Sequence, residues 1–407
     1  MQKLSLTNKY PPYSKYKDSG AEWLGDIPEH WNVLKLQRLY HKLKRTGFEK
    51  EELLSVYRDR GVIIKSSRSD NHNNASEDLS TYQLVEVGDL AINKMKAWQG
   101  SLAVSPHRGI VSPAYYVCRP LSDNDSKFIH YLLRSKLYIK QYEQNSGGVR
   151  NNQWDLRYEM FRKIEAVLPP KAEQEKIARF LDEQTARIDE TIIKKQKLIE
   201  LLKEEIVSFA QNEQMNGKGK TIRIRDLFKL AERPIELEDY SEYVALGLYN
   251  RGRGLFDKDP QLGKDIKESD FYKVIPRDLI ISGQFAWEGA VALASKDEGK
   301  CVVSHRYYLL RDGVIKTEYL LALLMTKFGD HILNESSRGS AGRNRPLNIK
   351  IFLKEKIRVP SKETETKIES LLIKMSLVRD NIKKSIKLLQ EYKSALISHA
   401  VTGKIKI

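Results

Sequence analysis

The 407-residue chain has only two cysteines, Cys118 and Cys301, and they do not occupy equivalent places in the internal repeat described below. This scarcity argues against a disulfide framework and against a thiolate metal site. The longest purely apolar run, Tyr319–Met325, is seven residues long and far too short to span a bilayer. The first twenty residues contain no apolar segment of the kind found in secretory signals. These absences predict a reduced, cytoplasmic protein.

Motifs that carry catalysis are also scarce. The sequence has no HExxH pair, no GxSxG elbow and no Asn/Asp-Pro-Pro-aromatic motif of the kind that amino-methyltransferases use to hold a target base. Residues 217–221 end like a phosphate-binding loop, but Gln214 stands where that loop needs its first glycine. We therefore interpret this segment as a basic linker, and we predict no catalytic residue and no metal site in this chain.

One alternative is a metal-dependent nuclease. Asp278, Glu298 and Lys300 loosely resemble a PD–ExK site, in which carboxylates hold Mg²⁺ and a lysine helps to activate water. However, Asp278 aligns with Asp89 of the first half of the chain, and no ExK pattern follows Asp89. A repeated aspartate before a strand is better explained as a structural residue.

The excess of positive charge indicates a negatively charged binding partner. Seventy Lys and Arg residues against 54 Asp and Glu residues give a net charge of +16. Such an excess is typical of proteins that bind polyanions, most often nucleic acid. The remaining alternative is a coiled-coil scaffold that binds protein and no DNA, in which the lysines serve only to keep its helices soluble.

The two halves of the chain repeat one another at an offset of 189 to 193 residues. Segments 168–189 and 359–380 share six identical residues in 22 pairs, and further matches keep the same order. These matches are Val33-x-Lys35 with Ile222-x-Ile224, Arg60-Gly61 with Arg251-Gly252, Asp89-Leu90 with Asp278-Leu279, Ala97-Trp98-x-Gly100 with Ala286-Trp287-x-Gly289, Val111-Ser112-x-x-Tyr115-Tyr116 with Val303-Ser304-x-x-Tyr307-Tyr308, and Arg150-Asn151 with Arg343-Asn344. The chain is therefore a tandem duplication.

Each half begins with a globular part and ends with a long helix. The globular parts mix short alternating runs with Gly, Asn, Ser and Pro breaks, which predicts α+β domains. The two helical segments carry one narrow apolar stripe at steps of three, four or seven residues, which is typical of a coiled coil. The predicted boundaries are 1–168 for the first domain, 169–213 for the first helix, 214–221 for a linker, 222–358 for the second domain, 359–400 for the second helix and 401–407 for a tail.

A helix with so narrow a stripe is not stable alone in water. We therefore expect the two helices to pair in an antiparallel coiled coil, related by a pseudo-two-fold axis, with the duplicated domains separated by it. Pairing with another protein is the alternative. The predicted core residues are Ile177, Leu181, Ile188, Ile192, Ile199, Leu202, Ile206, Ile368, Leu371, Met375, Val378, Ile382, Ile386, Leu389 and Leu396.

Basic and amide side chains gather in the predicted loops of both domains. Arginine and lysine bind phosphates and guanine, whereas asparagine and glutamine recognise adenine. We interpret Trp98 and Trp287, which both halves share, as core residues rather than as base-stacking groups. The candidate DNA-binding residues are Arg58, Arg60, Lys94, Lys96, Gln99, Arg108, Arg150, Asn151, Asn152 and Gln153 in the first half, and Arg251, Arg253, Gln284, Arg306, Arg338, Arg343, Asn344 and Arg345 in the second.

Three motifs resemble those of one known family, the specificity subunits of Type I restriction–modification systems. Residues 16–31, which include Tyr16-Lys17-Asp18-Ser19-Gly20, are similar to the N-terminal signature of that family. Residues 168–182 are similar to its central conserved region, and residues 400–405 are similar to its C-terminal ending. The segment 359–380 departs from the central pattern, because Pro360-Ser361-x-x-Thr364-Glu365 replaces PPxxEQ.

The resemblance covers the whole chain and implies two target-recognition domains, a two-helix spacer and no catalytic activity in this chain. It implies binding to a bipartite, asymmetric site on double-stranded DNA. It also implies assembly with two modification subunits, which methylate adenine using S-adenosylmethionine, and with restriction subunits, which translocate and cleave DNA using ATP and Mg²⁺.

Overall fold

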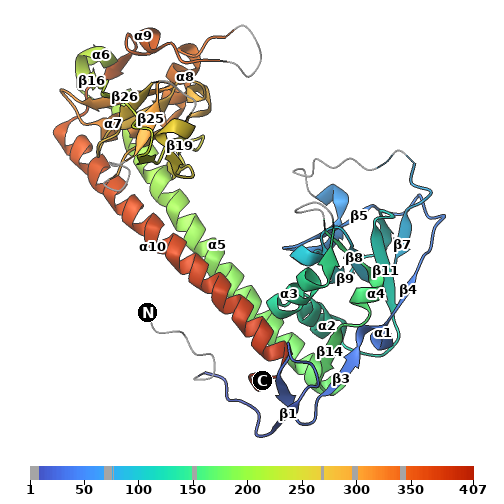
Figure 1. Ribbon diagram of the computed structural model, residues 1–407. Helices are drawn as coiled ribbons and strands as arrows, with labels where there is room; N and C mark the ends of the chain where they lie inside the picture. The colour runs from blue at the N-terminus through green and yellow to red at the C-terminus, as the bar shows by residue number, and fades with distance from the viewer. Residues whose placement is uncertain are drawn as a thin grey trace. The chain divides into compact units, whose positions relative to one another are not determined.

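The computed structural model describes residues 9–67, 76, 78–148, 154–266, 270–295, 301–339 and 345–407. The chain divides into two compact units: unit 1 comprises Met1–Ile193 with Ser385–Ile407, and unit 2 comprises Lys194–Lys384. Both units combine strands with helices, so the expected mixture of α and β structure is confirmed (Figure 1). Among the described residues, every helix is too short or too polar to traverse a bilayer.

The centre of unit 1 is a four-stranded antiparallel sheet in the order β4-β11-β8-β9. Leu90 and Ile92 of β8 face one side, where they join the apolar core of helices α2 and α3. Ala91 faces the other side and packs in a smaller core with the β5–β6 hairpin. Both faces of the sheet are covered, which explains why β8 is a continuous apolar run rather than an alternating one.

The strands of unit 1 are β1 (Tyr16–Asp18), β2 (Asp26–Pro28), β3 (Asn32–Lys35), β4 (Tyr40–Leu43), β5 (Leu54–Tyr57), β6 (Gly61–Ile64), β7 (Gln83–Val85), β8 (Leu90–Asn93), β9 (Leu102–Val104), β10 (Gly109–Val111), β11 (Tyr115–Pro120), β12 (Ser146–Gly147), β13 (Asp155–Leu156) and β14 (Glu165–Leu168). Its short helices are α1 (Leu36–Leu39), α2 (Ser126–Leu133), α3 (Lys136–Gln144) and α4 (Tyr158–Phe161).

Unit 2 repeats this topology. Its central antiparallel sheet has the order β16-β26-β23-β24, which matches the order of unit 1 strand for strand. Leu279 and Ile281 of β23 pack against helix α7, whereas Ile280 faces the core of the β19–β20 hairpin. The duplication inferred from the sequence is therefore present in the fold.

The strands of unit 2 are β15 (Thr221–Arg223), β16 (Phe228–Leu230), β17 (Pro234–Ile235), β18 (Glu242–Tyr243), β19 (Leu246–Leu248), β20 (Leu255–Asp257), β21 (Gln261–Leu262), β22 (Phe271–Lys273), β23 (Leu279–Ser282), β24 (Val291–Leu293), β25 (Val302–Ser304), β26 (Tyr307–Asp312) and β27 (Lys356–Arg358). Its short helices are α6 (Ile224–Leu227), α7 (Thr317–Leu324), α8 (Lys327–Glu335) and α9 (Ile349–Phe352).

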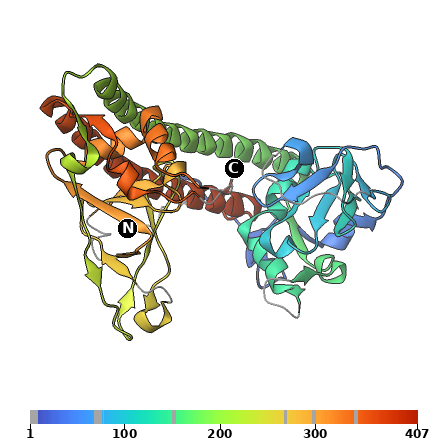
Figure 2. The same ribbon diagram turned by 90° about the horizontal axis from the view of Figure 1, so that it is seen from above.

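Two long helices, α5 (Lys171–Asn216) and α10 (Lys362–Val401), each contribute residues to both units. They lie side by side in both views (Figures 1 and 2). Helix α5 begins after Pro169-Pro170 and ends three residues beyond the predicted boundary, whereas α10 begins three residues after its predicted start, beyond Pro360. Proline disfavours a helical conformation in the residue before it, which delays both starts.

The helices are antiparallel within each unit. In unit 1 the first part of α5 meets the last part of α10, where Lys393 Nζ lies 2.7 Å from an Asp189 carboxylate oxygen. In unit 2 the last part of α5 meets the first part of α10, where Glu213 accepts hydrogen bonds from Ser361 N–H (3.0 Å) and Thr364 Oγ1 (2.7 Å).

The predicted core positions of the two helices are buried or half-buried. The fully buried ones include Ile177, Leu181, Ile206, Ile368 and Leu396. The exposed large apolar residues of the two helices are Ile193, Leu198, Leu201, Phe209, Met215, Ile373, Leu377 and Leu388, and none of them is among the predicted core positions.

In each unit a buried polar residue near the start of a long helix is hydrogen-bonded to the sheet domain. Gln174 of α5 accepts a hydrogen bond from Asp125 N–H (2.9 Å) and donates to Pro169 O and Asn124 Oδ1 (2.9 Å each). Glu365 of α10, at the equivalent repeat position, accepts from Lys316 N–H (2.7 Å) and from Lys362 Nζ (2.8 Å). The same backbone donor is satisfied in both units, but a carboxylate with a lysine replaces the amide in unit 2.

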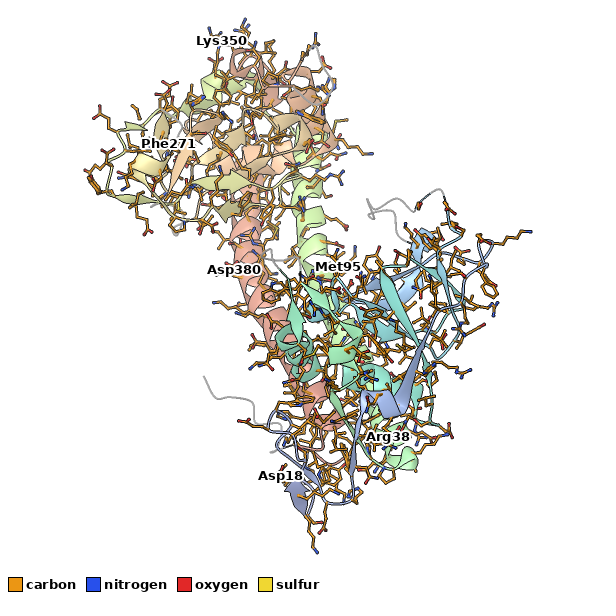
Figure 3. The ribbon with its side chains drawn as sticks, turned by 45° about the vertical axis from the view of Figure 1, so that its right-hand side comes forward. Asp18, Arg38, Met95, Phe271, Lys350 and Asp380 are labelled. Atoms are coloured by element: carbon orange, nitrogen blue, oxygen red, sulfur yellow. The ribbon has the colours of Figure 1, made fainter. Side chains whose placement is uncertain are left out.

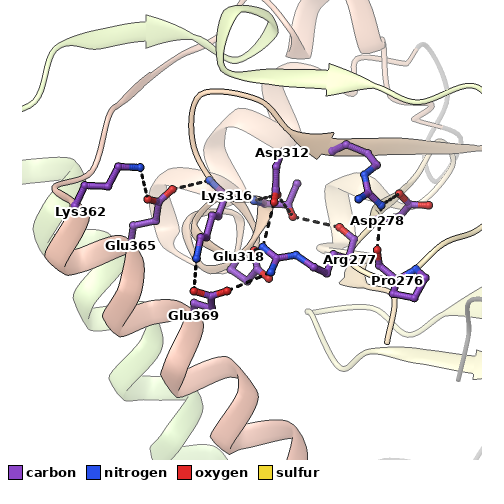
Figure 4. Close-up of polar contacts among 11 residues, drawn as sticks. Pro276, Arg277, Asp278, Asp312, Lys316, Glu318, Lys362, Glu365 and Glu369 are labelled. Carbon is purple, nitrogen blue, oxygen red and sulfur yellow. Dashed lines mark hydrogen bonds and ion pairs between the residues drawn. The ribbon is translucent and has the colours of Figure 1, made fainter. Parts of the chain in front are cut away.

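In unit 2, Arg277 makes an ionic connection between the sheet domain and α10 (Figure 4). The Arg277 guanidinium donates to Glu318 (3.0 Å), Asp312 (3.1 Å) and Glu369 of α10 (3.2 Å). Arg277 has a φ of 71°, and its counterpart in unit 1 is Gly88, with a φ of 91°. The left-handed backbone is therefore kept in both repeats, although only one of them places a side chain there.

We expect Gln174→Glu to lower the free energy of unfolding by about 1–3 kcal/mol, because the new carboxylate oxygen would face the Pro169 and Asn124 oxygens without a donor. Chemical denaturation of the full chain would measure this loss. Glu175→Gln, on an exposed position of the same turn, is the matched control and should leave stability unchanged. Equal stability of the two variants would contradict the role assigned to Gln174.

Candidate nucleic-acid interface

A cleft of about 1340 Å³ in unit 1 is bordered by the β5–β6 hairpin and by the chain that follows β8. Three of the predicted DNA-binding residues, Arg58, Lys96 and Gln99, line it. Sequence reasoning missed other polar lining residues, including Lys65, Tyr82 and Asn93. Cations, amides and tyrosines on one concave surface can contact both phosphates and base edges.

The repeated Ala-Trp-x-Gly motif forms a tight turn at the edge of this cleft. We call residues 93–101 of unit 1 and 282–290 of unit 2 the AWxG turns. In unit 1, Ala97–Gln99 make one turn of 3₁₀ helix and Gly100 follows with a φ of 90°. A Cβ atom on Gly100 would lie 2.8 Å from Ile139 Cδ1, so both the conformation and the space require glycine.

The two shared tryptophans support these turns from beneath. Trp98 is half-buried, with its ring centroid 5.3 Å from that of Trp154. Trp287 is also half-buried, and the Arg345 guanidinium lies 5.3 Å from its ring centroid. Both rings pack on another side chain, but neither is a fully buried core residue of the kind interpreted from the sequence.

In unit 1 a single arginine joins the AWxG turn to the neighbouring hairpin. The Arg134 guanidinium donates to the backbone carbonyls of Arg58 (2.5 Å), Leu102 (2.9 Å) and Tyr57 (3.4 Å). It is largely buried, and this burial lowers its pKa from the usual value. This role was not predictable from the repeat, because the residue equivalent to Arg134 in the other half is Met325.

Unit 2 makes the same connection with backbone atoms. Arg251 N–H donates to Glu288 O and Gly252 N–H donates to Gly289 O, both at 2.8 Å. Arg251 has a φ of 59°, which allows the hairpin loop to approach the turn this closely. Hairpin and turn thus form one rigid element in each unit.

A cluster of cations surrounds the hairpin loop of unit 2. Lys203 of α5 donates to Arg251 O (2.6 Å), and Arg253 donates to Asn250 O (3.0 Å) with its guanidinium 5.4 Å from the Tyr249 ring centroid. Burial lowers the pKa of Lys203, the Asp330 carboxylate raises it, and Arg253 and Arg251 lower it. Asp330 therefore offsets part of the repulsion among these cations, and a phosphate would offset more of it.

The predicted residues differ in their surroundings. Arg58, Arg60, Lys96, Arg251, Arg253, Gln284 and Arg306 are exposed, and Lys94 and Gln99 are half-buried. Arg60 also lies 3.7 Å from an Asp59 carboxylate oxygen. Arg150, Asn151, Asn152, Gln153, Arg343 and Asn344 lie outside the described residues.

Three predicted arginines are engaged by the protein itself. Arg108 pairs with Glu51 (2.9 Å) and with Glu86, and these carboxylates raise its pKa. Arg338 pairs with Glu335. Arg345 donates to Ser337 O (3.0 Å) while it stacks on Trp287. These partners support the scaffold, so this group is less suited to DNA contact than the residues at the cleft.

The aspartates of the considered nuclease pattern are structural. Asp278 is fully buried, ion-paired to Arg233 and Arg311, and accepts a hydrogen bond from Ile275 N–H (2.9 Å). Asp89 is equally buried in unit 1 and pairs with Arg45. Glu298 and Lys300 lie outside the described residues. A carboxylate that is buried between two arginines is not available to hold Mg²⁺.

Comparison with known proteins agrees with this geometry. Residues 28–203 match the family described as Type I restriction modification DNA specificity domain. The Type I restriction enzyme EcoKI specificity subunit of Escherichia coli (strain K12) is 23% identical over 193 residues, which cover 44% of this chain and 41% of that relative. The aligned segment thus spans about two-fifths of the curated relative.

Two solved structures are similar to most of the chain. One, from work described as "Structural basis underlying complex assembly and conformational transition of the type I R-M system", is 13% identical with a TM-score of 0.60, covering 92% of this chain and 98% of the other. The crystal structure of the HsdS subunit from Thermoanaerobacter tengcongensis is 13% identical with a TM-score of 0.45, covering 93% and 98%. The first likeness shows a common architecture.

A histidine beneath the unit 1 hairpin generates a pH-dependent prediction. Burial, and then Arg134, lower the pKa of His130 to about 4, so the folded protein keeps this side chain neutral. Between pH 6.5 and 4 the unfolded chain binds a proton that the folded chain excludes, and stability therefore falls as the pH falls through this range. Below pH 4 the excluded proton lowers the free energy of unfolding by on the order of 3 kcal/mol, and above pH 6.5 this loss is absent.

We expect His130→Leu, which introduces the residue found at the equivalent position 321, to flatten this part of the stability curve. Urea denaturation at a series of pH values would measure the difference from the unmodified chain. His41→Leu, at an exposed position, should keep the original slope. Identical slopes for His130→Leu and the unmodified chain would contradict the assignment.

Proposed function

Because residues 28–203 match the family described as Type I restriction modification DNA specificity domain, we propose that this chain is the DNA specificity subunit of a Type I restriction–modification system. In this role it binds a bipartite, asymmetric DNA site and carries no catalytic activity itself. The observation that carries the proposal is the repeat: two units with one topology present different side chains at equivalent exposed positions. Two similar domains with different contact residues suit two different half-sites.

Electrostatics supports duplex DNA as the ligand. The net charge of +16 favours a polyanion, and exposed cations lie beside the cleft of unit 1 and in the hairpin loop of unit 2. Lysine and arginine at such positions hold phosphates, while the amides among them supply base contacts.

The long helices would set the distance between half-sites. Because α5 and α10 each contribute to both units, a change in their length is transmitted to the spacing of the DNA contacts. We propose them as a spacer on this ground.

The same function defines the partners. The chain would direct two modification subunits, which bind S-adenosylmethionine and methylate adenine, and restriction subunits that use ATP and Mg²⁺. Its site of action would be the cytoplasm.

The salt dependence of duplex binding tests the proposal. If about eight phosphates are contacted, the logarithm of the binding constant should fall with the logarithm of salt concentration at a slope of about −7. Fluorescence anisotropy with a labelled duplex would measure it. A flat response would favour the protein-binding scaffold, whereas Mg²⁺-dependent cutting by the purified chain, abolished by Glu298→Ala, would favour the nuclease.

A length change tests the spacer. Seven residues inserted in each long helix, after Ile193 and after Lys384, add roughly 10 Å of helix. The tolerated gap between half-sites should then grow by about three base pairs, since duplex DNA rises 3.4 Å per pair. Methylation mapping in cells that carry the variant would report the gap. A seven-residue insertion in the loop after Tyr240, which is 83% exposed, is the control and should leave the gap unchanged.

A further inference from the structure

The two AWxG turns have the same backbone hydrogen bonds, with N···O distances that agree within about 0.1 Å. Three hydrogen bonds show this: Gln99 N–H to Lys96 O matches Glu288 N–H to Phe285 O (3.0 Å each), Gly100 N–H to Ala97 O matches Gly289 N–H to Ala286 O (2.7 Å each), and Ser101 N–H to Lys96 O (3.1 Å) matches Ala290 N–H to Phe285 O (3.2 Å). The turn is therefore a fixed frame that has been kept in both repeats.

The residues that hold this frame are also kept. Ala97 and Ala286 are fully buried, and Gly100 and Gly289 both have left-handed backbones, with φ values of 90° and 70°. A larger side chain would not fit at the two buried alanines, and a residue other than glycine would be strained at the two left-handed positions.

The outward positions of the frame differ completely. Met95, Lys96 and Gln99 of unit 1 correspond to Gln284, Phe285 and Glu288 of unit 2. Two of these side chains are apolar and yet exposed, Met95 at 43% and Phe285 at 45%. Figure 3 labels Met95 on unit 1, and the cleft of that unit includes it with Lys96 and Gln99. Gln99 and Glu288 are half-buried, whereas the other four side chains are exposed. A fixed frame that carries variable, accessible side chains is an arrangement suited to base recognition.

The turn of unit 2 carries a half-buried carboxylate, Glu288. Glu288 is held by the Asn250 side-chain amide, beside a loop rich in arginine. A carboxylate near DNA is repelled by phosphates, so its favourable partners are the amino groups of bases, such as cytosine N4. Gln284 suits adenine, and the exposed Phe285 ring suits a thymine methyl group or an unstacked base. In unit 1, Lys96 suits guanine and Gln99 suits adenine.

From these observations we infer that the AWxG turns are the base-reading elements, and that Met95, Lys96 and Gln99 set the sequence preference of unit 1 while Gln284, Phe285 and Glu288 set that of unit 2. This inference rests on the proposed function, which it deepens by assigning specificity to six positions.

Exchange of these side chains between the repeats tests the inference. The variant of unit 1 carries Met95→Gln, Lys96→Phe and Gln99→Glu, and the variant of unit 2 carries Gln284→Met, Phe285→Lys and Glu288→Gln. Lys94 and Gly283 stay as they are, because a Cβ on Gly283 would lie 2.6 Å from Arg306 O. Val87→Gln and Val314→Met, at positions that are 67% and 61% exposed, are the matched controls.

The measurement is selection of bound duplexes from a random library by each full-length chain, followed by sequencing. We expect each triple variant to change the preferred bases in one half-site only, with a roughly ten- to hundred-fold loss on the original sequence. The controls should select the original site. Should a triple variant unfold, Met95→Gln and Phe285→Met alone are predicted to shift the preference in the same half-sites.

The other possible results contradict either the inference or the proposed function. An unchanged preference in both triple variants would end the inference and leave the proposed function intact. If a triple variant bound all DNA sequences more weakly by the same factor, the turns would contact phosphates rather than bases, and the inference would be wrong. If the unmodified chain selects no sequence, the proposed function fails, and the inference fails with it.

Discussion

Burial of the apolar stripes of α5 and α10 against each other is the contact on which the architecture depends. Neither stripe is wide enough to stabilise its helix alone. Each unit therefore takes a segment of both helices, so that unit 1 joins Met1–Ile193 to Ser385–Ile407. Tyr16 donates to Gly403 O (3.0 Å), and Lys406 N–H donates to Pro11 O (2.8 Å), which ties the two ends of the chain together. Unit 1 is complete only when the last residues are present, whereas unit 2 is one continuous segment.

The two repeats keep the same backbone arrangement but use different side chains at equivalent positions. Gln174 and Glu365 accept from the equivalent backbone N–H group, with a neutral amide in unit 1 and a carboxylate in unit 2. Arg134 joins hairpin to turn in unit 1, whereas two backbone hydrogen bonds do so in unit 2. Each exchange keeps the geometry and changes the side chain that supports it. The topology is therefore shared even though few residues are identical, because dihedral angles and burial constrain only a small number of positions.

The parts of the fold that were predictable from sequence are those encoded locally. Heptad spacing identified the long helices, and ordered matches such as the AWxG motif identified the repeat, because both depend on residues close in the chain. The sheet order was not predictable, since it depends on long-range pairing. The same reason explains Arg108, an exposed loop cation by pattern, whose partners Glu51 and Glu86 come from distant segments. Helix ends differed by two or three residues, where prolines and capping contacts decide.

The variable side chains of the AWxG turns lie on a backbone that is the same in both repeats. A base-contacting group on a flexible loop would lose conformational freedom on binding, and that loss would weaken the complex. On the AWxG turn the backbone is already fixed by Gly100, by Ala97 and, through the hairpin, by Arg134. Substitutions at the outward positions therefore alter which base is preferred without a cost to the fold. A duplicated domain of this kind can acquire a second specificity through a few exposed residues, while every buried position remains under the same constraint.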